Sequence, residues 1–219
     1  MKKNLNLSIL LIVAMILYAL CGLSINQHGG YLYLSWLFWN LFLAVLPVFF
    51  AFGVQMIPKW NIVSIFLSIL WILFLPNACY MVTDLIYLNS SSFIGPDGSY
   101  LQHLYAWIEL FYIASGVFLA MVCGLFSTHL MTQKLQFKTS ISHMIWLMII
   151  SLLCGYGVYI GRFLRLNSWD ILHPRSLILK LFENMNSFTL LFTIMTAVFY
   201  FIAALIFEAM MNNEMTKPQ

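Results

Sequence analysis

Long apolar stretches, separated by short polar breaks, form the main pattern along this 219-residue chain. Each stretch is close to or longer than the ~20 residues that an α-helix needs to cross about 30 Å of hydrocarbon. The pattern therefore predicts about six membrane-spanning helices, at residues 7–25, 31–56, 61–88, 103–131, 139–161 and 187–210. Little chain is left over, so we expect residues 1–219 to form a single integral membrane domain of the all-α, polytopic bundle class.

The polar breaks contain turn residues and most of the charges, at residues 26–30, 57–59, 89–102, 133–138 and 162–186. Pro76 interrupts the third stretch and predicts a kink there. The first apolar run is longer than the 7–15-residue core of a typical signal peptide, and no A-x-A-like cleavage site follows it. We therefore expect the first run to be a retained helix.

Composition agrees with a lipid-embedded protein, because 63% of the residues are hydrophobic and 8% are charged. Soluble domains have roughly 25% charged residues. The net charge of +3, without a basic block, argues against a nucleic-acid partner. The four cysteines lie in apolar stretches without a CxxC pair, which indicates packing thiols. We find no HExxH-like spacing, P-loop or dinucleotide loop, and therefore predict no metal and no cofactor.

Lysines gather in alternate breaks, which bears on the orientation of the chain. If the N-terminus is inside, the cytoplasmic side holds Lys2, Lys3, Lys59, Lys134, Lys138 and Lys217. The other side holds Lys180 and all three arginines. Lysine and arginine near spans favour the cytoplasm, so we predict that both termini are cytoplasmic. Near the cytoplasmic surface the spans hold few ionisable residues, namely His129, His143 and Glu208.

Two further patterns concern helix packing. Residues 176–186 have one apolar face and predict a short helix lying at the outer membrane surface, before the last span. Small residues recur every four positions at Gly116, Ala120 and Gly124, and again at Gly157 and Gly161. This spacing lets helices approach closely, either within the chain or in a homodimer.

Polar residues at membrane depth are costly and mark candidate sites. After Pro76, a resumed helix would place Asn77, Tyr80 and Asp84 at i, i+3 and i+7, on one face pointing into the bundle. Asn40 lies near the middle of the second span. The alternative is a proline kink whose polar groups satisfy one another.

Arginines follow the fifth span, against the positive-inside tendency. On a helix Arg162 and Arg165 would lie one turn apart, and two guanidinium groups make a good clamp for phosphate or carboxylate. The alternative is that they pair with Asp84, Glu109 or Asp170 and lock the helices together. The ligand-binding residues that we predict are Arg162, Arg165, Asn167, Asp170, Asn77, Tyr80 and Asn40.

The same stretches carry a family resemblance. Residues 73–80 with 83–85, and residues 161–170, resemble the FPNAPY-x-x-TDL and GRFLR-x-NSWD motifs of a family of uncharacterised bacterial multipass membrane proteins. Residues 39–44 and Pro47 also resemble that family. Cys79 stands where the family usually has proline, and Glu109 where Asp is more common. The resemblance implies a multipass protein of the bacterial cytoplasmic membrane and names no reaction.

Three functions remain open. The first is a binding or transport protein whose outward-facing polar site holds an anionic lipid or cell-envelope precursor on its arginines. The second is a membrane-embedded enzyme acting on envelope lipid or lipoprotein, with Asp84 or Glu109 as catalytic base. The third is a structural or accessory subunit. The expected partners are the lipid bilayer, the anionic ligand, and either a second copy or another membrane protein.

Overall fold

The computed structural model describes residues 2–29, 34–88, 92–166, 180–181 and 183–215. Helices dominate the described residues, and the one β-type pairing among them is an isolated bridge between Ile94 and Tyr100. In chain order the elements are α1 (Lys2–Gly29), α2 (Leu34–Met56), α3 (Ile62–Phe74), α4 (Pro76–Tyr80), the 3₁₀ helix η1 (Met81–Tyr87), α5 (Leu104–Leu135), α6 (Ser140–Phe163) and α8 (Ser187–Met215). The predicted all-α class is therefore confirmed.

Five segments in the described part of the chain are long and apolar enough to cross a membrane: Trp36–Met56, Ile62–Tyr87, Leu104–Leu135, Ser140–Phe163 and Ser187–Asn212. A shorter apolar segment, Ile9–Ile25, lies within α1 and corresponds to the first predicted span. The chain is thus a multipass membrane protein. Residues 176–179 and 182 of the interfacial helix expected over 176–186 lie outside the described residues, so this helix stays a prediction, as does the orientation of the termini.

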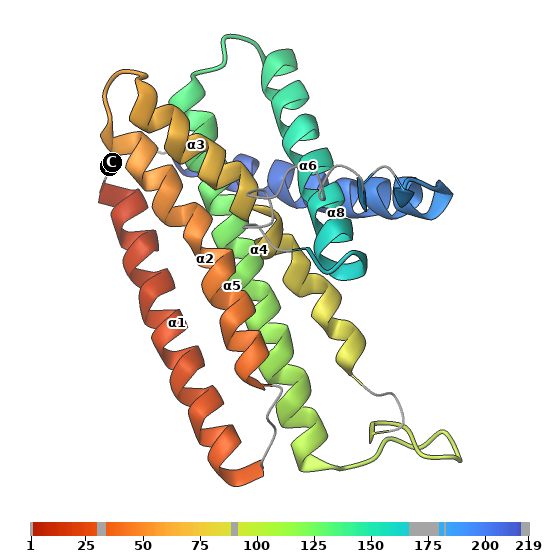
Figure 1. The fold of residues 1–219 in the computed structure, drawn as a ribbon. Coiled ribbons are helices and arrows are strands. Elements are labelled where there is room, and N and C mark those ends of the chain that lie inside the picture. Colours follow the sequence, from red (N-terminus) through yellow and green to blue (C-terminus); the bar gives the residue numbers. More distant parts are fainter. Residues whose placement is uncertain (1, 30–33, 89–91, 167–179, 182, 216–219) are drawn as a thin grey trace.

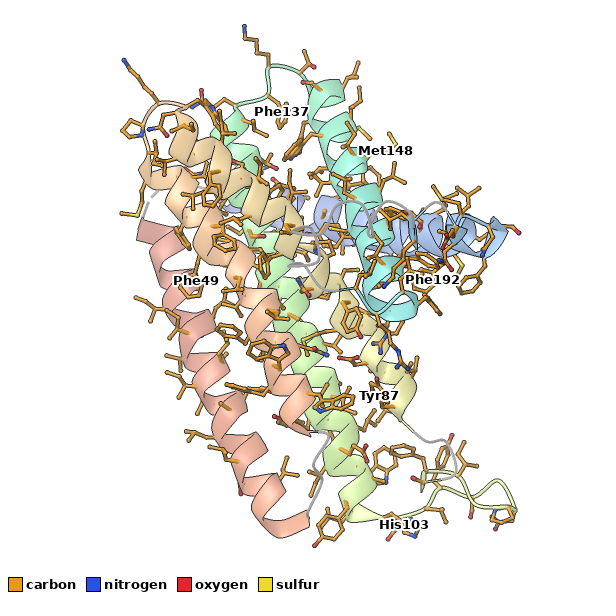
Figure 2. All side chains as sticks on the ribbon, viewed as in Figure 1. Phe49, Tyr87, His103, Phe137, Met148 and Phe192 are labelled. Atoms are coloured by element: carbon orange, nitrogen blue, oxygen red, sulfur yellow. The ribbon has the colours of Figure 1, made fainter. Side chains whose placement is uncertain are left out.

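Large apolar side chains cover the outside of the bundle, as expected of a surface that faces lipid. Figure 2 labels two of them, Phe49 of α2 and Met148 of α6, which are 59% and 49% exposed. The core holds fully buried side chains such as Trp71, Phe126 and Tyr200. The polar atoms of Trp71 and Tyr200 are paired: the Trp71 Nε1 donates to Ser127 Oγ at 3.1 Å, and Tyr200 Oη lies 2.8 Å from Thr128 Oγ1.

Successive helices alternate in direction, and α8 runs across the others, packed mainly on α6 (Figure 1). The connections 57–61 and 136–139 meet at one end, which we call the lysine end because it holds Lys59, Lys134 and Lys138. Lys134 Nζ donates to the carbonyl oxygens of Ile57 and Pro58, which ties the two connections together. The α5–η1 connection lies at the opposite end of the bundle.

Side-chain caps explain where the helices at the lysine end begin. Asn61 and Ser64 form a capping box at the start of α3, with Ser64 N donating to Asn61 Oδ1 at 2.9 Å. Thr139 caps α6 by accepting from Ser142 N at 3.1 Å. Gln136 closes α5 with a left-handed φ of 49°. These caps confirm short, ordered turns between the spans.

Pro76 divides the third span and positions the site. Since proline has no N–H to continue the ladder, α3 ends at Phe74 and Pro76 begins the short α4. The chain then tightens into η1, where three residues make a turn and side chains at i and i+3 stack. The predicted break is thus present, and the helix resumes as the α-helix that we expected for five residues before it changes to the 3₁₀ period at Met81.

Glycines on α6 bring it against the broken span. A side chain at Gly157 would collide with the Pro76 ring, and one at Gly161 would lie 3.3 Å from the Tyr80 ring. On α5, a side chain at Gly124 would meet Ala78 at 2.7 Å. These small residues therefore serve packing within the chain, one of the two uses that their spacing indicated.

Candidate functional site

A cavity of about 1000 Å³ lies between α2, the broken third span and the last turns of α6. Most of its wall is apolar or aromatic, including Trp36, Trp39, Leu43, Ile72, Leu153 and Tyr156. Trp36 and Trp39 are 68% and 51% exposed, so the cavity opens on the outer surface of the bundle rather than being sealed inside it. Among the described residues three charged ones line it, Asp84, Arg162 and Arg165, which gives the described part of the wall a formal charge of −1 + 2 = +1.

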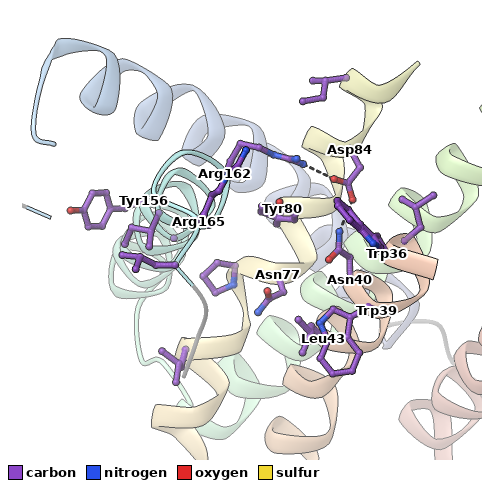
Figure 3. Close-up of a pocket in the computed structure, with 18 of the residues that line it drawn as sticks. Trp36, Trp39, Asn40, Leu43, Asn77, Tyr80, Asp84, Tyr156, Arg162 and Arg165 are labelled. Atoms are coloured by element: carbon purple, nitrogen blue, oxygen red, sulfur yellow. Dashed lines mark hydrogen bonds and ion pairs between the residues drawn. The ribbon is translucent and has the colours of Figure 1, made fainter. Parts of the chain in front are cut away.

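A buried ion pair forms one wall of the cavity. Arg162 reaches from the last turn of α6 to Asp84 on η1, with Asn40 and Tyr80 close by (Figure 3). Arg162 Nη2 lies 2.5 Å from Asp84 Oδ1, and Asn40 Nδ2 donates to Asp84 Oδ2 at 3.0 Å. Asp84 is 1% exposed. Both carboxylate oxygens are therefore paired, which offsets the large cost of burying the charge.

The guanidinium of Arg162 has partners on every side. Its Nε donates to Thr83 Oγ1 at 2.8 Å, its Nη2 also reaches Thr83 Oγ1, and its Nη1 donates to Tyr87 Oη at 3.2 Å. Its Cζ lies 4.3 Å from the centre of the Tyr80 ring, in cation–π contact. Tyr80 ends α4, and Thr83, Asp84 and Tyr87 follow it in η1 at i+3, i+4 and i+7, a helical spacing that places all four toward α6. One guanidinium can thus contact four side chains of a single segment.

Arg165 occupies a different position from the one expected. The sequence suggested two arginines one turn apart on a helix, but α6 ends at Phe163 and Arg165 has a left-handed φ of 53°. Leu166 N donates to Ile160 O at 3.4 Å, which turns the chain back at the helix end. Arg165 is exposed at the edge of the cavity. Both arginines therefore line the cavity, but Arg162 is held by hydrogen bonds to its neighbours and Arg165 is exposed at the opening.

Most of the predicted site residues that the structure describes meet in this cavity. Its lining includes Asn40, Asn77, Tyr80, Asp84, Arg162 and Arg165. The amide of Asn77 also donates to Phe74 O at 2.9 Å, across the proline break. Glu109, in the second turn of α5, is half-buried and is absent from the lining. Asn167 and Asp170 lie outside the described residues.

Sequence reasoning missed Thr83, Tyr87 and the aromatic residues of the opening. Thr83 and Tyr87 stand at i+3 and i+7 from Tyr80, a spacing that an α period also places on the face of Asp84, so this spacing was the signal that could have identified them. Among the described residues no group of three or more His, Cys, Asp or Glu side chains has an arrangement that would hold a metal ion.

Comparisons with known proteins identify the family of this chain but not its function. No curated protein and no solved structure matches the chain. Residues 39–203 match the family described as "Protein of unknown function (DUF1361)", a range that covers most of the chain and nearly all of the cavity wall. This multipass membrane protein with a cation-lined cavity therefore belongs to the DUF1361 family.

Proposed function

We propose that the cavity binds an anionic amphiphile, a lipid or a lipid-linked envelope precursor, that enters from the bilayer. The observation that carries this proposal is the combination of an apolar cavity of about 1000 Å³, open on the lipid-facing surface, with a net positive wall. Acyl chains would lie along the apolar wall formed by residues such as Leu43, Ile72 and Leu153, while the headgroup would meet the arginines.

The two arginines have different roles in this proposal. Arg162 is already saturated by Asp84, Thr83 and Tyr87, so it positions η1 against α6 and keeps the wall in shape. Arg165, exposed at the opening, supplies the direct contact to a phosphate or carboxylate. A charged hydrogen bond of this kind contributes about 1.5–3 kcal/mol.

The enzyme alternative has less support from the geometry. A general base needs an oxygen that reaches the substrate proton. Asp84 is buried with both oxygens hydrogen-bonded, and Glu109 is not part of the cavity wall. The accessory-subunit alternative is favoured by one observation, the helix-locking contact between Arg162 and Asp84, and the experiment below separates it from ligand binding.

The test is native mass spectrometry of the protein in mild detergent, titrated with short-chain phosphatidylglycerol or with zwitterionic phosphatidylcholine as the probe. We expect preference for the anionic lipid. Arg165→Gln should weaken phosphatidylglycerol binding about tenfold or more and leave phosphatidylcholine binding unchanged. Leu43→Trp, which fills the apolar wall, should weaken both.

Lys138→Gln is the matched control, because it removes one positive charge at the lysine end, away from the cavity. Equal binding of the anionic lipid by the wild type, Arg165→Gln and Lys138→Gln would overturn the proposal. If none of the three proteins binds the anionic lipid, and if only variants of Arg162 have a lower melting temperature, the contact between Arg162 and Asp84 has the accessory, helix-locking role.

A further inference from the structure

Four aromatic side chains of the cavity form two pairs with different surroundings. Tyr80 and Tyr87, from the third span, hold the Arg162 guanidinium, whose Cζ lies 4.3 and 5.7 Å from the two ring centres. Trp36 and Trp39, from the first two turns of α2, are more than half exposed. The tyrosines therefore belong to the wall around the ion pair, whereas the tryptophans present ring surface to a molecule that enters the cavity.

The position of these two tryptophans differs from that of a simple membrane anchor. Tryptophans near the ends of spans commonly anchor a protein at the membrane surface. Trp60 fits that description, because it lies at the lysine end, its ring centre is 5.9 Å from Lys134 Nζ, and it does not line the cavity. Trp36 and Trp39 both line the cavity, together with the amide of Asn40 on the same helix (Figure 3).

Uncharged polar groups of the cavity lie on walls other than the one that carries Arg165. Asn40 is one turn beyond Trp36 on α2, and Asn77 is in α4 on the broken span. Both amides are half-buried and both line the cavity. A side-chain amide has two N–H donors and one oxygen acceptor, so the hydrogen bond from Asn40 to Asp84 uses only part of its capacity.

This combination of groups selects among anionic headgroups. A headgroup that consists of a phosphate alone would bind Arg165 and leave the amides against acyl chains, where polar groups are costly. A ring of hydroxyl groups matches the amides, because each hydroxyl both donates and accepts. The C–H bonds on the face of such a ring carry a slight positive charge and pack well on the negative face of an indole. A cyclic polyol therefore suits both the amides and the tryptophans.

We propose that the lipid bound in the cavity has a headgroup with a cyclic polyol, a sugar or an inositol, joined to the chains through its phosphate. Arg165 binds the phosphate, Trp36 and Trp39 pack against the C–H face of the ring, and the amides of Asn40 and Asn77 bond its hydroxyl groups. This inference rests on the anionic-lipid binding proposed above and narrows it to one class of headgroup.

The test is native mass spectrometry of the full chain in mild detergent, titrated with short-chain phosphatidylinositol or phosphatidylglycerol. Both probes are anionic phosphodiesters, so they differ mainly in the ring. The wild type should bind phosphatidylinositol about tenfold more tightly. Trp36→Leu and Trp39→Leu should each reduce this preference and leave phosphatidylglycerol binding within about twofold of the wild type, whereas Trp36→Phe, which keeps an aromatic face, should keep most of it. Trp60→Leu is the matched control and should behave as the wild type.

The outcomes separate this inference from the function on which it rests. Equal binding of the two anionic lipids would overturn the cyclic polyol and leave anionic-lipid binding intact. If neither lipid binds more tightly than phosphatidylcholine, the proposed function itself is wrong. A preference that persists in both Trp36→Leu and Trp39→Leu, or that is also lost in Trp60→Leu, would contradict the role of the two tryptophans. Soluble inositol phosphate at the same concentration should not displace the lipid, because it has no chains for the apolar wall, and displacement would overturn the assignment to a lipid.

Discussion

Two buried carboxylates in this chain are paired in different ways. Asp84, on the cavity wall, has both oxygens paired, one with Arg162 and one with Asn40. Glu208, in the core between α5 and α8, pairs one oxygen with His129 and has its other oxygen unpartnered among the described residues. An arginine brings a fixed charge and five N–H donors to a carboxylate, whereas each histidine nitrogen makes a single hydrogen bond.

The difference lies in how completely each carboxylate is paired. The Arg162 network joins η1 to α6 through several hydrogen bonds. The His129 contact joins α5 to α8 through one hydrogen bond to Glu208. One fold thus has a fully paired carboxylate on the cavity wall and a partly paired one between α5 and α8.

The largest expected effect comes from breaking the ion pair between Arg162 and Asp84. Arg162→Leu leaves a carboxylate that is 1% exposed without its cation, and we expect a loss of about 3–5 kcal/mol of stability. Thermal unfolding in detergent at neutral pH measures it. The matched control is Arg165→Leu, which removes an exposed arginine of the same cavity and should change stability by less than about 0.5 kcal/mol. Equal losses in both variants would contradict the division between the two arginines.

The next largest effect is expected when Asp84 loses one of its two partners, so that it is paired as incompletely as Glu208. Asn40→Leu removes the donor to Asp84 Oδ2, so Asp84 would have one paired and one unsatisfied oxygen, as Glu208 has. We expect a loss of about 1–3 kcal/mol, the cost of an unsatisfied buried acceptor. Chemical unfolding compared with the wild type measures the loss, and unchanged stability would mean that Asn40 is not a necessary partner.

The sequence predicted the helical bundle and the break at Pro76 well, because span length and proline chemistry are local properties. It also drew attention to Asn40, Asn77, Tyr80 and Asp84, since polar residues are conspicuous in apolar spans. It named Asp84 among three carboxylates with which the arginines could pair, and Arg162 does pair with Asp84. It did not single out Thr83 and Tyr87 as further partners, because the helical spacing of uncharged side chains beside a carboxylate becomes informative only once the packing of α6 places the arginine. It noted His129 and Glu208 without joining them, because the rotation of α8 relative to α5 is set by packing between distant segments.

A smaller effect is expected when Arg162 loses its hydrogen bond to Thr83. Thr83→Val keeps the shape of the side chain and removes the hydroxyl that accepts from Arg162 Nε. The ion pair with Asp84 remains, so we expect a loss of about 1 kcal/mol. A melting curve beside that of Thr189→Val, which alters a threonine of α8 away from the cavity, would distinguish this contact from a general effect of the substitution. A loss as large as that of Arg162→Leu would argue against Asp84 as the main partner.

The smallest effect is expected at the partly paired carboxylate. Glu208→Gln keeps an acceptor for His129 Nδ1, so stability should stay within about 1 kcal/mol of the wild type. The equivalent exchange at Asp84, to Asn, leaves the cation of Arg162 without its carboxylate and should cost more. Equal costs of the two exchanges in thermal unfolding would remove the distinction between the two carboxylates.

The 3₁₀ winding of the segment that supports Asp84 also sets how far the third span reaches. A 3₁₀ helix rises about 2.0 Å per residue and an α-helix about 1.5 Å, so the seven residues of η1 are about 3.5 Å longer than they would be in α winding. The same residues advance by about 120° each instead of about 100°, which turns Asp84 by about 80° relative to Tyr80 from its place in an unbroken α-helix. The pitch of one short segment thereby sets both the length of the third span and the side from which Asp84 meets Arg162.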